Sequence, residues 1–220
     1  MVKIFLDTSN IEDIKKYDAL IDGVTTNPTL ARKAGFSDMH EVAEEVSKLI
    51  YPRHVSVEVI STKTEGMVKE AKKLAEINDN IVIKIPLTMD GLKATKELAK
   101  QGVKVNNTLV FSANQALLAA KVGARYASIF VGRLDDISFN SLSVIESCSK
   151  IWKNYNFKTP YGERCELLIA SIRHPLHVIK CLECGVDVVT IPPSVLDLMI
   201  KHPKTDEGLE RFLRDWGVLK

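Results

Sequence analysis

Residues Ile81–Pro86, IVIKIP, enclose one lysine in five apolar residues. We interpret this stretch as a β-strand, in which alternate side chains point to opposite faces. Lys84 then lies on the face opposite to the three isoleucines. An ammonium group in such a wall loses hydration, so the neutral amine becomes accessible and can attack a carbonyl to form a Schiff base. The alternative is a lysine that is paired with a carboxylate or reaches out to water.

The same alternation of a short apolar strand and a helical period recurs along the whole chain. The expected strands are Lys3–Asp7, Gly23–Thr26, Val55–Ile60, Ile81–Pro86, Val103–Asn107, Arg125–Val131, Glu166–Ser171 and Asp187–Ile191. Eight strand-then-helix units in about 200 residues predict an α/β fold, a single closed (β/α)8 TIM barrel domain over residues 1–220. An open doubly wound sheet is the alternative. It would be expected to carry a glycine-rich turn after the first strand, where Asp7–Asn10 has no glycine.

The composition is that of an ordinary globular protein with enough apolar side chains for a sizeable core. Of the 220 residues, 45% are hydrophobic and 26% are charged. The net charge of +2 gives no reason to expect nucleic-acid or membrane partners. No apolar run approaches the ~20 residues of a membrane span, and the first residues run straight into a strand pattern. We therefore expect no signal peptide and a cytoplasmic protein.

Four cysteines are present, and two of them, Cys181 and Cys184, form a C-x-x-C pair. The pair lies in a predicted helix that ends at Gly185, whereas a redox motif opens a helix after a strand. Four well-spaced zinc ligands are missing. We expect reduced cysteines, with no metal site.

Polar residues share one parity near the carboxyl ends of seven predicted strands. They are Asp7, Thr25 with Asn27, Glu58, Lys84, Asn106 with Thr108, Ser128 with Phe130 on the same parity, and Ser171 with Arg173. The apolar residues of opposite parity would face the helices, so the polar set would face the lumen. Barrel active sites are built at the carboxyl ends of the strands. The pattern therefore predicts an active site around Lys84.

Two long segments, GVTTNPTLA at Gly23–Ala31 and IVIKIPLTMDGLKATKEL at Ile81–Leu98, resemble the transaldolase family. The resemblance is to its short branch, which is shared with fructose-6-phosphate aldolases, and it spans nearly the whole chain. Shorter matches are FLDTSN at 5–10, VNNTLVFS at 105–112, SIFVGR at 128–133 and IASIRHP at 169–175. Ala31 replaces a larger aliphatic residue of the family. The loop Thr159–Arg164 belongs to no motif, and its role stays open.

The resemblance implies a class I aldolase barrel that transfers a dihydroxyacetone unit between sugar phosphates, without a cofactor or metal. It implies the following roles: Lys84 as the Schiff-base residue, Asp7 as general base for the C4 hydroxyl, Glu58 and Thr108 as holders of the catalytic water, Asn27, Asn106 and Ser128 as partners of the three-carbon unit, and Arg133, Ser171 and Arg173 as phosphate ligands. Simpler readings stay open for three residues. Asp7 could only keep Lys84 charged, Glu58 could be an ion-pair partner, and Arg133 could form a surface ion pair.

Two positions favour transfer over release of the three-carbon unit. Fructose-6-phosphate aldolases of the family carry glutamine in place of Glu58 and tyrosine in place of Phe130. We therefore expect a transaldolase of the pentose phosphate pathway. Its donors would be fructose 6-phosphate or sedoheptulose 7-phosphate, and its acceptors erythrose 4-phosphate or glyceraldehyde 3-phosphate. An aldolase that releases dihydroxyacetone is the alternative. A non-catalytic barrel or a phosphate-binding isomerase would not require Lys84.

The C-terminal stretch Thr205–Lys220 is expected to add a helix, at about 205–216, beyond the eighth barrel unit. Leu209, Phe212, Leu213 and Trp216 fall at helical spacing and form an apolar stripe. Packing on its own barrel is one possibility. The resemblance implies the other, in which the helix reaches a neighbouring subunit of a homo-oligomer, a pentamer or a decamer.

Overall fold

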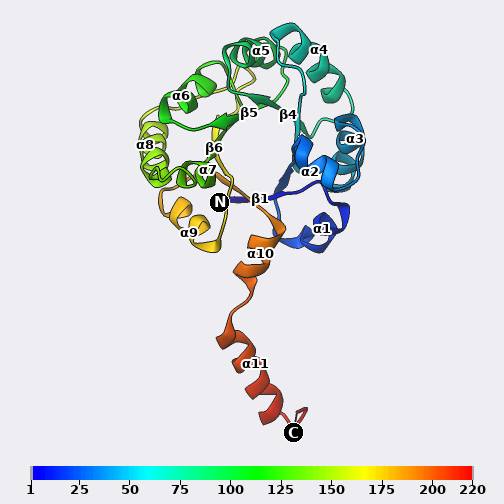
Figure 1. Cartoon of the computed structure of the whole chain (residues 1–220), viewed down its shortest axis with the longest axis vertical. Helices are drawn as coiled ribbons and strands as arrows, with labels where there is room; N and C mark the ends of the chain where they lie inside the picture. Colours follow the sequence, from blue (N-terminus) through cyan, green and yellow to red (C-terminus); the bar gives the residue numbers. More distant parts are fainter. Residues whose placement is uncertain (1, 220) are drawn as a thin grey trace.

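Eight parallel strands close into a barrel in the computed structural model, which describes residues 2–219. Each strand pairs with the next, and β8 pairs back to β1 (Figure 1). The strands are β1 Lys3–Asp7, β2 Gly23–Thr25, β3 His54–Glu58, β4 Ile81–Pro86, β5 Val105–Val110, β6 Tyr126–Phe130, β7 Glu166–Ala170 and β8 Val188–Ile191. The predicted closed barrel is confirmed, and the open doubly wound sheet is excluded.

Helices surround the ring of strands and begin at short polar caps. They are α1 Ile11–Lys16, η1 Asp18–Leu20, α2 Pro28–Lys33, α3 Met39–Ile50, α4 Thr64–Ala75, α5 Met89–Lys100, α6 Ala113–Lys121, α7 Val131–Asp135, α8 Ser141–Asn154, α9 Pro175–Glu183, α10 Pro193–Ile200 and α11 Pro203–Asp215. Asn10, Asp38 and Ser112 each accept a backbone N–H bond at a helix start. These caps fix where the chain turns from a strand end into the outer layer.

Two apolar layers follow from the alternation of side chains along the strands. The outer layer packs strand residues such as Ile83 and Ile129 against helix residues such as Leu98. The inner layer fills the lumen with Phe5, Val82, Tyr126, Phe130, Leu168, Ala170 and Val188. Lys84 shares the parity of Val82, so the same alternation directs its side chain inward.

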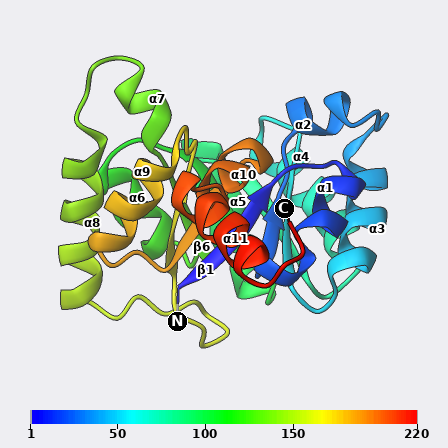
Figure 2. The same cartoon turned by 90° about the horizontal axis from the view of Figure 1, so that it is seen from below.

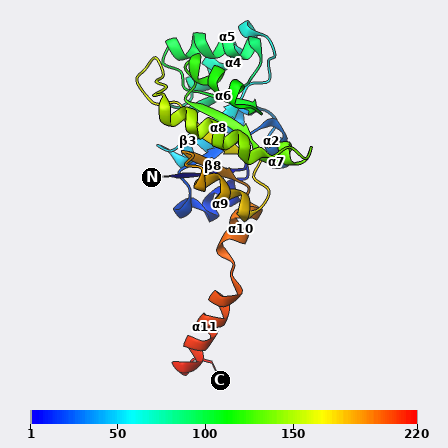
Figure 3. The same ribbon diagram turned by 90° about the vertical axis from the view of Figure 1, so that its left-hand side faces the viewer.

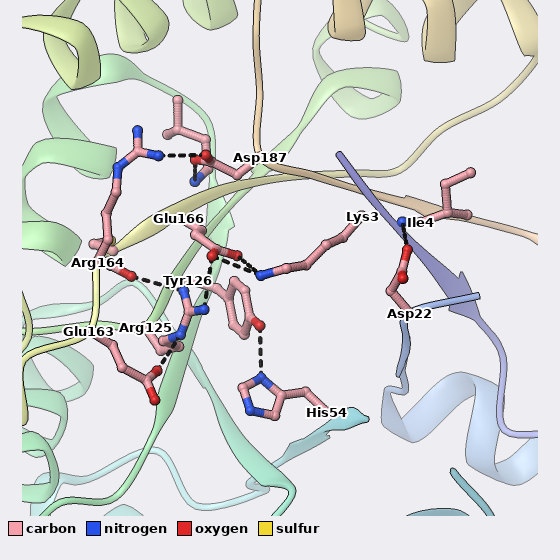
Figure 4. Close-up of polar contacts among 12 residues, drawn as sticks. Lys3, Ile4, Asp22, His54, Arg125, Tyr126, Glu163, Arg164, Glu166 and Asp187 are labelled. Atoms are coloured by element: carbon pink, nitrogen blue, oxygen red, sulfur yellow. Dashed lines mark hydrogen bonds and ion pairs between the residues drawn. The ribbon is translucent and has the colours of Figure 1, made fainter. Parts of the chain in front are cut away.

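The amino-terminal end of the barrel is closed by a polar floor (Figure 4). Nδ1 of His54 lies 2.8 Å from the hydroxyl of Tyr126. Glu166 accepts from Lys3 at 2.8 Å and from Nη2 of Arg125 at 2.9 Å. These side chains occupy the end of the lumen opposite to Lys84.

Strand β5 differs from its predicted range, because it covers 105–110 and not 103–107. Its pairing with β6 shifts between Asn107 and Val110, and Leu109 has a φ of 58°. Such a bulge bends a strand locally and re-aims its side chains. The short helix α7 was also not predicted, because it follows β6 without a loop.

Helix α11 stands away from the barrel (Figures 1 and 3). Seen from below, it crosses the view in front of the barrel and ends at the carboxyl terminus (Figure 2). None of its residues is buried, and Leu209, Phe212 and Trp216 are strongly exposed. Packing of this stripe on its own barrel is therefore not observed. No helix within residues 2–219 is both long and apolar enough to cross a membrane.

Candidate active site

Lys84 lies buried near the carboxyl end of β4, with 5% of its surface exposed. Its Nζ donates to the carbonyl of Thr26 at 2.9 Å and lies 3.1 Å from Oε2 of Glu58. The register of β3 and β4 makes Glu58 and Lys84 direct neighbours. The lysine is thus paired with a carboxylate and also faces a cavity, so both readings of the sequence describe part of its surroundings.

Two connected spaces open above the apolar lumen. The inner cavity has a volume of about 110 Å³, and the outer cleft, which shares Asp7, Asn27 and Lys84 with it, has about 600 Å³. Every predicted site residue lines one or both of these spaces, except Asn106. The predicted set is therefore brought together around Lys84, but the predicted parity of Ser171 and Arg173 is wrong. The inward residues of β7 are Leu168 and Ala170, and Ser171 follows the end of the strand in a left-handed conformation, with a φ of 61°.

Asp7 ends β1 beside Thr25, which donates to its Oδ1 at 2.7 Å. Burial raises the pKa of the Asp7 carboxyl, while the charge of Lys84 and the hydrogen bond from Thr25 act to lower it. A carboxylate with a raised pKa is better suited to accept a proton and later return it than one that is held strongly acidic.

Asn106 lies behind Ser128 and not at the cavity wall. The hydroxyl of Ser128 donates to Oδ1 of Asn106 at 2.7 Å, and Nδ2 of Asn106 lies 3.1 Å from Oγ of Ser56. Because its only proton is used, Oγ of Ser128 is available to the cavity as an acceptor. Asn106 therefore orients Ser128, a relation that the strand parity alone did not predict.

Asn27 has a structural role in addition to its predicted role as a partner of the three-carbon unit. It is the N-cap of α2, and its Oδ1 accepts from the backbone N–H of Leu30 at 3.0 Å. Its Nδ2 makes no hydrogen bond to any other residue in the described part of the chain. The amide is thus fixed by the helix start and keeps its donor for a ligand.

Thr108 on β5 is 1% exposed and lines the outer cleft together with Glu58 and Lys84. Its Oγ1 is buried and has no hydrogen-bond partner within residues 2–219. Buried hydroxyls are normally paired, so an unpaired one at a cavity wall is suited to hold a water or a ligand hydroxyl.

Arg133, Ser171 and Arg173 line the outer cleft, and Arg133 and Ser171 also line the inner cavity. The guanidinium of Arg133 lies 5.0 Å from the centre of the Phe130 ring, and Nη2 of Arg173 lies 2.7 Å from Oδ2 of Asp136. A Cβ at Gly132 would lie 2.2 Å from the carbonyl oxygen of Ser171. Glycine is therefore needed there for α7 to approach the end of β7, which brings the two arginines to one side of the cleft.

Thr190, Ser56 and Asp136 belong to the site although they were not predicted. Thr190 has the inward parity of β8 and lines the inner cavity, so the same parity argument applied to Val188–Ile191 would have found it. Ser56 and Asp136 act through hydrogen bonds between different elements, for which the sequence carries no spacing signal.

The cysteines lie outside this site. All four are free, and burial raises the pKa of the Cys148, Cys165 and Cys181 thiols to about 12. At neutral pH these thiols are protonated and poor nucleophiles. Across residues 2–219 no three His, Cys, Asp or Glu side chains gather as a metal site would require.

Sequence comparison with known proteins finds similarity along nearly the whole length of the chain. Residues 4–220 match the family model described as transaldolase/fructose-6-phosphate aldolase. A probable transaldolase of Nitrosopumilus maritimus is 51% identical over 100% of this chain and 96% of its own length. Probable transaldolases of Thermoplasma volcanium and Carboxydothermus hydrogenoformans are 53% and 51% identical, covering 98% and 100% of this chain and 95% and 100% of their own lengths.

A solved structure supports the fold alone. The thiamine phosphate pyrophosphorylase of Pyrococcus furiosus superposes with a TM-score of 0.59, at 16% identity, over 87% of this chain and 85% of its own. At this identity the likeness extends to the barrel and not to the chemistry.

Proposed function

The chain belongs to the transaldolase/fructose-6-phosphate aldolase family, and on that premise we propose that it is a transaldolase working through a Schiff base on Lys84. It would move a dihydroxyacetone unit from fructose 6-phosphate or sedoheptulose 7-phosphate to erythrose 4-phosphate or glyceraldehyde 3-phosphate. The observation that carries the proposal is the buried Lys84 amine, which faces one cavity together with Asp7 and lies 3.1 Å from Glu58.

Lys84 begins the reaction by attacking C2 of the ketose phosphate. The resulting carbinolamine loses water to give an iminium ion, which can accept an electron pair from the neighbouring carbon. The apolar residues of β4 support this role, because they hold the lysine side chain inside the barrel, where it lines the cavity. In the structure, Nζ of Lys84 donates to the carbonyl of Thr26 at 2.9 Å and lies 3.1 Å from Oε2 of Glu58.

Asp7 removes the proton from the C4 hydroxyl. The C3–C4 bond then breaks, its electron pair moves into the iminium to form an enamine, and the aldose phosphate leaves. Asp7 keeps the proton and returns it when the acceptor aldehyde is attacked. The burial that raises the pKa of Asp7 supports this exchange of one proton in both directions.

Glu58 and Thr108 handle the water that is lost on imine formation and needed for hydrolysis. The unpaired Oγ1 of Thr108 supplies one contact for this water, and the Glu58 carboxylate beside Lys84 supplies a base. Ser128 and Asn27 bind hydroxyls of the three-carbon unit, with Asn106 holding Ser128 in place.

Arg133, Ser171 and Arg173 bind the phosphate in the outer cleft that they line. Guanidinium groups match phosphate because each offers two parallel N–H donors.

Phe130 favours transfer over release. Its ring belongs to the inner apolar layer and lines the cavity with Lys84. A phenyl ring cannot position the water that would protonate the enamine and free dihydroxyacetone. Phe130 and Glu58 together support transaldolase over the aldolase alternative.

A homo-oligomer, a pentamer or a decamer, is the proposed assembly. Helix α11 projects from the barrel with Leu209, Phe212 and Trp216 exposed, as a segment that packs on a neighbouring subunit would be. The four free cysteines fit a reducing compartment, and we place the enzyme in the cytoplasm.

One assay tests the proposed function. Consumption of fructose 6-phosphate should be fast with erythrose 4-phosphate and slow without it, and sedoheptulose 7-phosphate should accumulate. Equal consumption with and without the acceptor, with release of dihydroxyacetone, would identify the aldolase instead. No consumption of either donor would reject both.

A further inference from the structure

A buried chain of three oxygen-bearing side chains runs behind the site, from β8 through β2 to β1. Oγ1 of Thr190 lies 2.6 Å from Oγ1 of Thr25, which lies 2.7 Å from Oδ1 of Asp7. Thr25 and Thr190 are each 2% exposed. This series of hydrogen bonds therefore ends on the carboxylate of Asp7, which is the base of the proposed mechanism.

The number of protons sets the direction of this chain. An ionised carboxylate only accepts hydrogen bonds, so Thr25 gives its single proton to Asp7. The oxygen of Thr25 can then only accept. Within residues 2–219, the hydroxyl of Thr190 is the group placed to donate to it. While Asp7 is ionised, the Thr25 hydroxyl therefore donates to Oδ1 of Asp7, and the Thr190 hydroxyl donates to Oγ1 of Thr25.

We propose that Thr190 is a positioning residue for Asp7, acting by holding the Thr25 hydroxyl as a donor to Oδ1. The proposal rests on the proposed function, in which Asp7 takes the C4 proton. Oδ2 of Asp7 accepts no hydrogen bond from any other described residue, so it is left for the substrate. Oδ1 of Asp7 is thus held by the Thr25 hydroxyl, and Oδ2 is left to accept the C4 proton of the substrate.

The hydrogen bond from Thr25 also affects the charge state of Asp7. The charged groups that line the cavities together with Asp7 are Lys84 on β4, Glu58 on β3, Arg133 on α7 and Arg173 after β7. Burial raises the pKa of Asp7, and the charge of Lys84 and the Thr25 hydrogen bond oppose that rise. A weaker bond from Thr25 would leave Asp7 protonated at a higher pH.

Thr190→Val tests this, because it removes the hydroxyl and keeps the branched shape. We expect kcat to fall about tenfold through misplacement of the base. The acid limb of the kcat/KM profile should move upward by about half to one pH unit, since the base must be ionised to act. Thr190→Ser should recover most of both effects, and KM should change less than kcat.

Thr95→Val is the matched control. Thr95 on α5 is also fully buried, and its hydroxyl donates to the carbonyl of Gly91 and accepts from Asn107, outside the lumen. Its loss should leave the pH profile in place. If Thr190→Val does not fold, Thr190→Ala compared with Thr190→Ser makes the same test. An unmoved acid limb in a folded variant, or a serine variant no better than valine, overturns the proposal.

Borohydride trapping with dihydroxyacetone separates this test from that of the proposed function. Formation of that adduct breaks no C3–C4 bond, so Thr190→Val should trap as much as the wild type. A wild type that traps nothing rejects the Schiff-base mechanism. A wild type that traps and turns over, with a Thr190→Val variant that matches it at every pH, rejects the role of Thr190 alone.

Discussion

Nη2 of Arg173 lies 2.7 Å from Oδ2 of Asp136, so one of the two arginines proposed to bind phosphate is already paired with a carboxylate. Both side chains are more than half exposed, at 52% and 57%. An exposed pair of this kind contributes only about 0.2–1 kcal/mol. Substrate phosphate would therefore compete with Asp136 at a small cost.

Substitution of these two residues should shift substrate affinity in opposite directions. Arg173→Ala should raise KM for fructose 6-phosphate roughly ten- to a hundredfold, because a charge-assisted hydrogen bond is typically worth ~1.5–3 kcal/mol. Asp136→Asn should lower KM by up to about fivefold, since the arginine is freed. The measurement is steady-state kinetics with phosphorylated and unphosphorylated donors.

The control for the arginine is Arg164→Ala. Arg164 pairs with Asp187 at the amino-terminal end of the barrel, remote from the cleft. Equal losses of Arg173→Ala with both donor types would show that Arg173 acts structurally and not on phosphate.

Phe130→Tyr should increase the release of dihydroxyacetone. The Phe130 side chain is 8% exposed and lines the inner cavity, and the centre of its ring lies 5.8 Å from the centre of the Phe111 ring. A hydroxyl added there can orient water toward the enamine, and a change of ~1.4 kcal/mol in selectivity would be tenfold. The ratio of aldolase to transfer rate is measured in the wild type, in Phe130→Tyr and in the remote control Phe157→Tyr. A flat ratio in a folded Phe130→Tyr variant would remove Phe130 from the partition.

Loss of the α11 stripe should dissociate the proposed oligomer. Phe212→Lys with Trp216→Lys puts charge on two exposed apolar side chains, and a chain ending at Lys204 removes the helix altogether. Light scattering should report a mass near the 24.5 kDa of one chain. Glu210→Ala, on a residue that pairs with Arg214, is the control. An unchanged mass in the truncated chain would contradict the assembly role of α11.

Stability should fall in acid because of His54 in the floor. Burial, helped by the nearby charges of Lys104 and Arg125, lowers the pKa of His54 from 6.5 to about 4. The neutral ring is favoured in the folded state, so its contribution is complete above pH 6.5 and is lost as the pH falls toward 4. Between pH 7 and 4.5 the loss should be about 2.5 kcal/mol.

Urea unfolding at both pH values measures this loss. His54→Gln should reduce the pH dependence of the unfolding free energy by about 2.5 kcal/mol. His40→Gln, at an exposed position on α3, is the matched control. Equal pH dependence in the wild type and His54→Gln would contradict the assignment.

Strand parity was sufficient to predict much of the site. In IVIKIP the alternation placed Lys84 inward, and the same rule placed Asp7, Glu58 and Ser128 around one end of the barrel. This succeeds because the side-chain period of a strand is two, and because a closed barrel has only one inside.

Side-chain contacts between different strands and helices could not be predicted from the alternation along single strands. Asn106 has the inward parity, yet it sits behind Ser128 because the two side chains bond laterally across β5 and β6. The bulge at Leu109 and the direct start of α7 depend on local backbone angles and on Gly132. The pairing of Arg173 with Asp136 joins segments 37 residues apart, for which the sequence has no periodic signal.

Covalent capture on Lys84 tests the central claim most directly. The protein is reduced with borohydride in the presence of fructose 6-phosphate, and the intact mass and the modified peptide are measured. The account predicts the addition of one reduced three-carbon unit, located on Lys84, and no addition to an inactive Lys84→Met variant. A label on another lysine, or turnover by Lys84→Met, would contradict it.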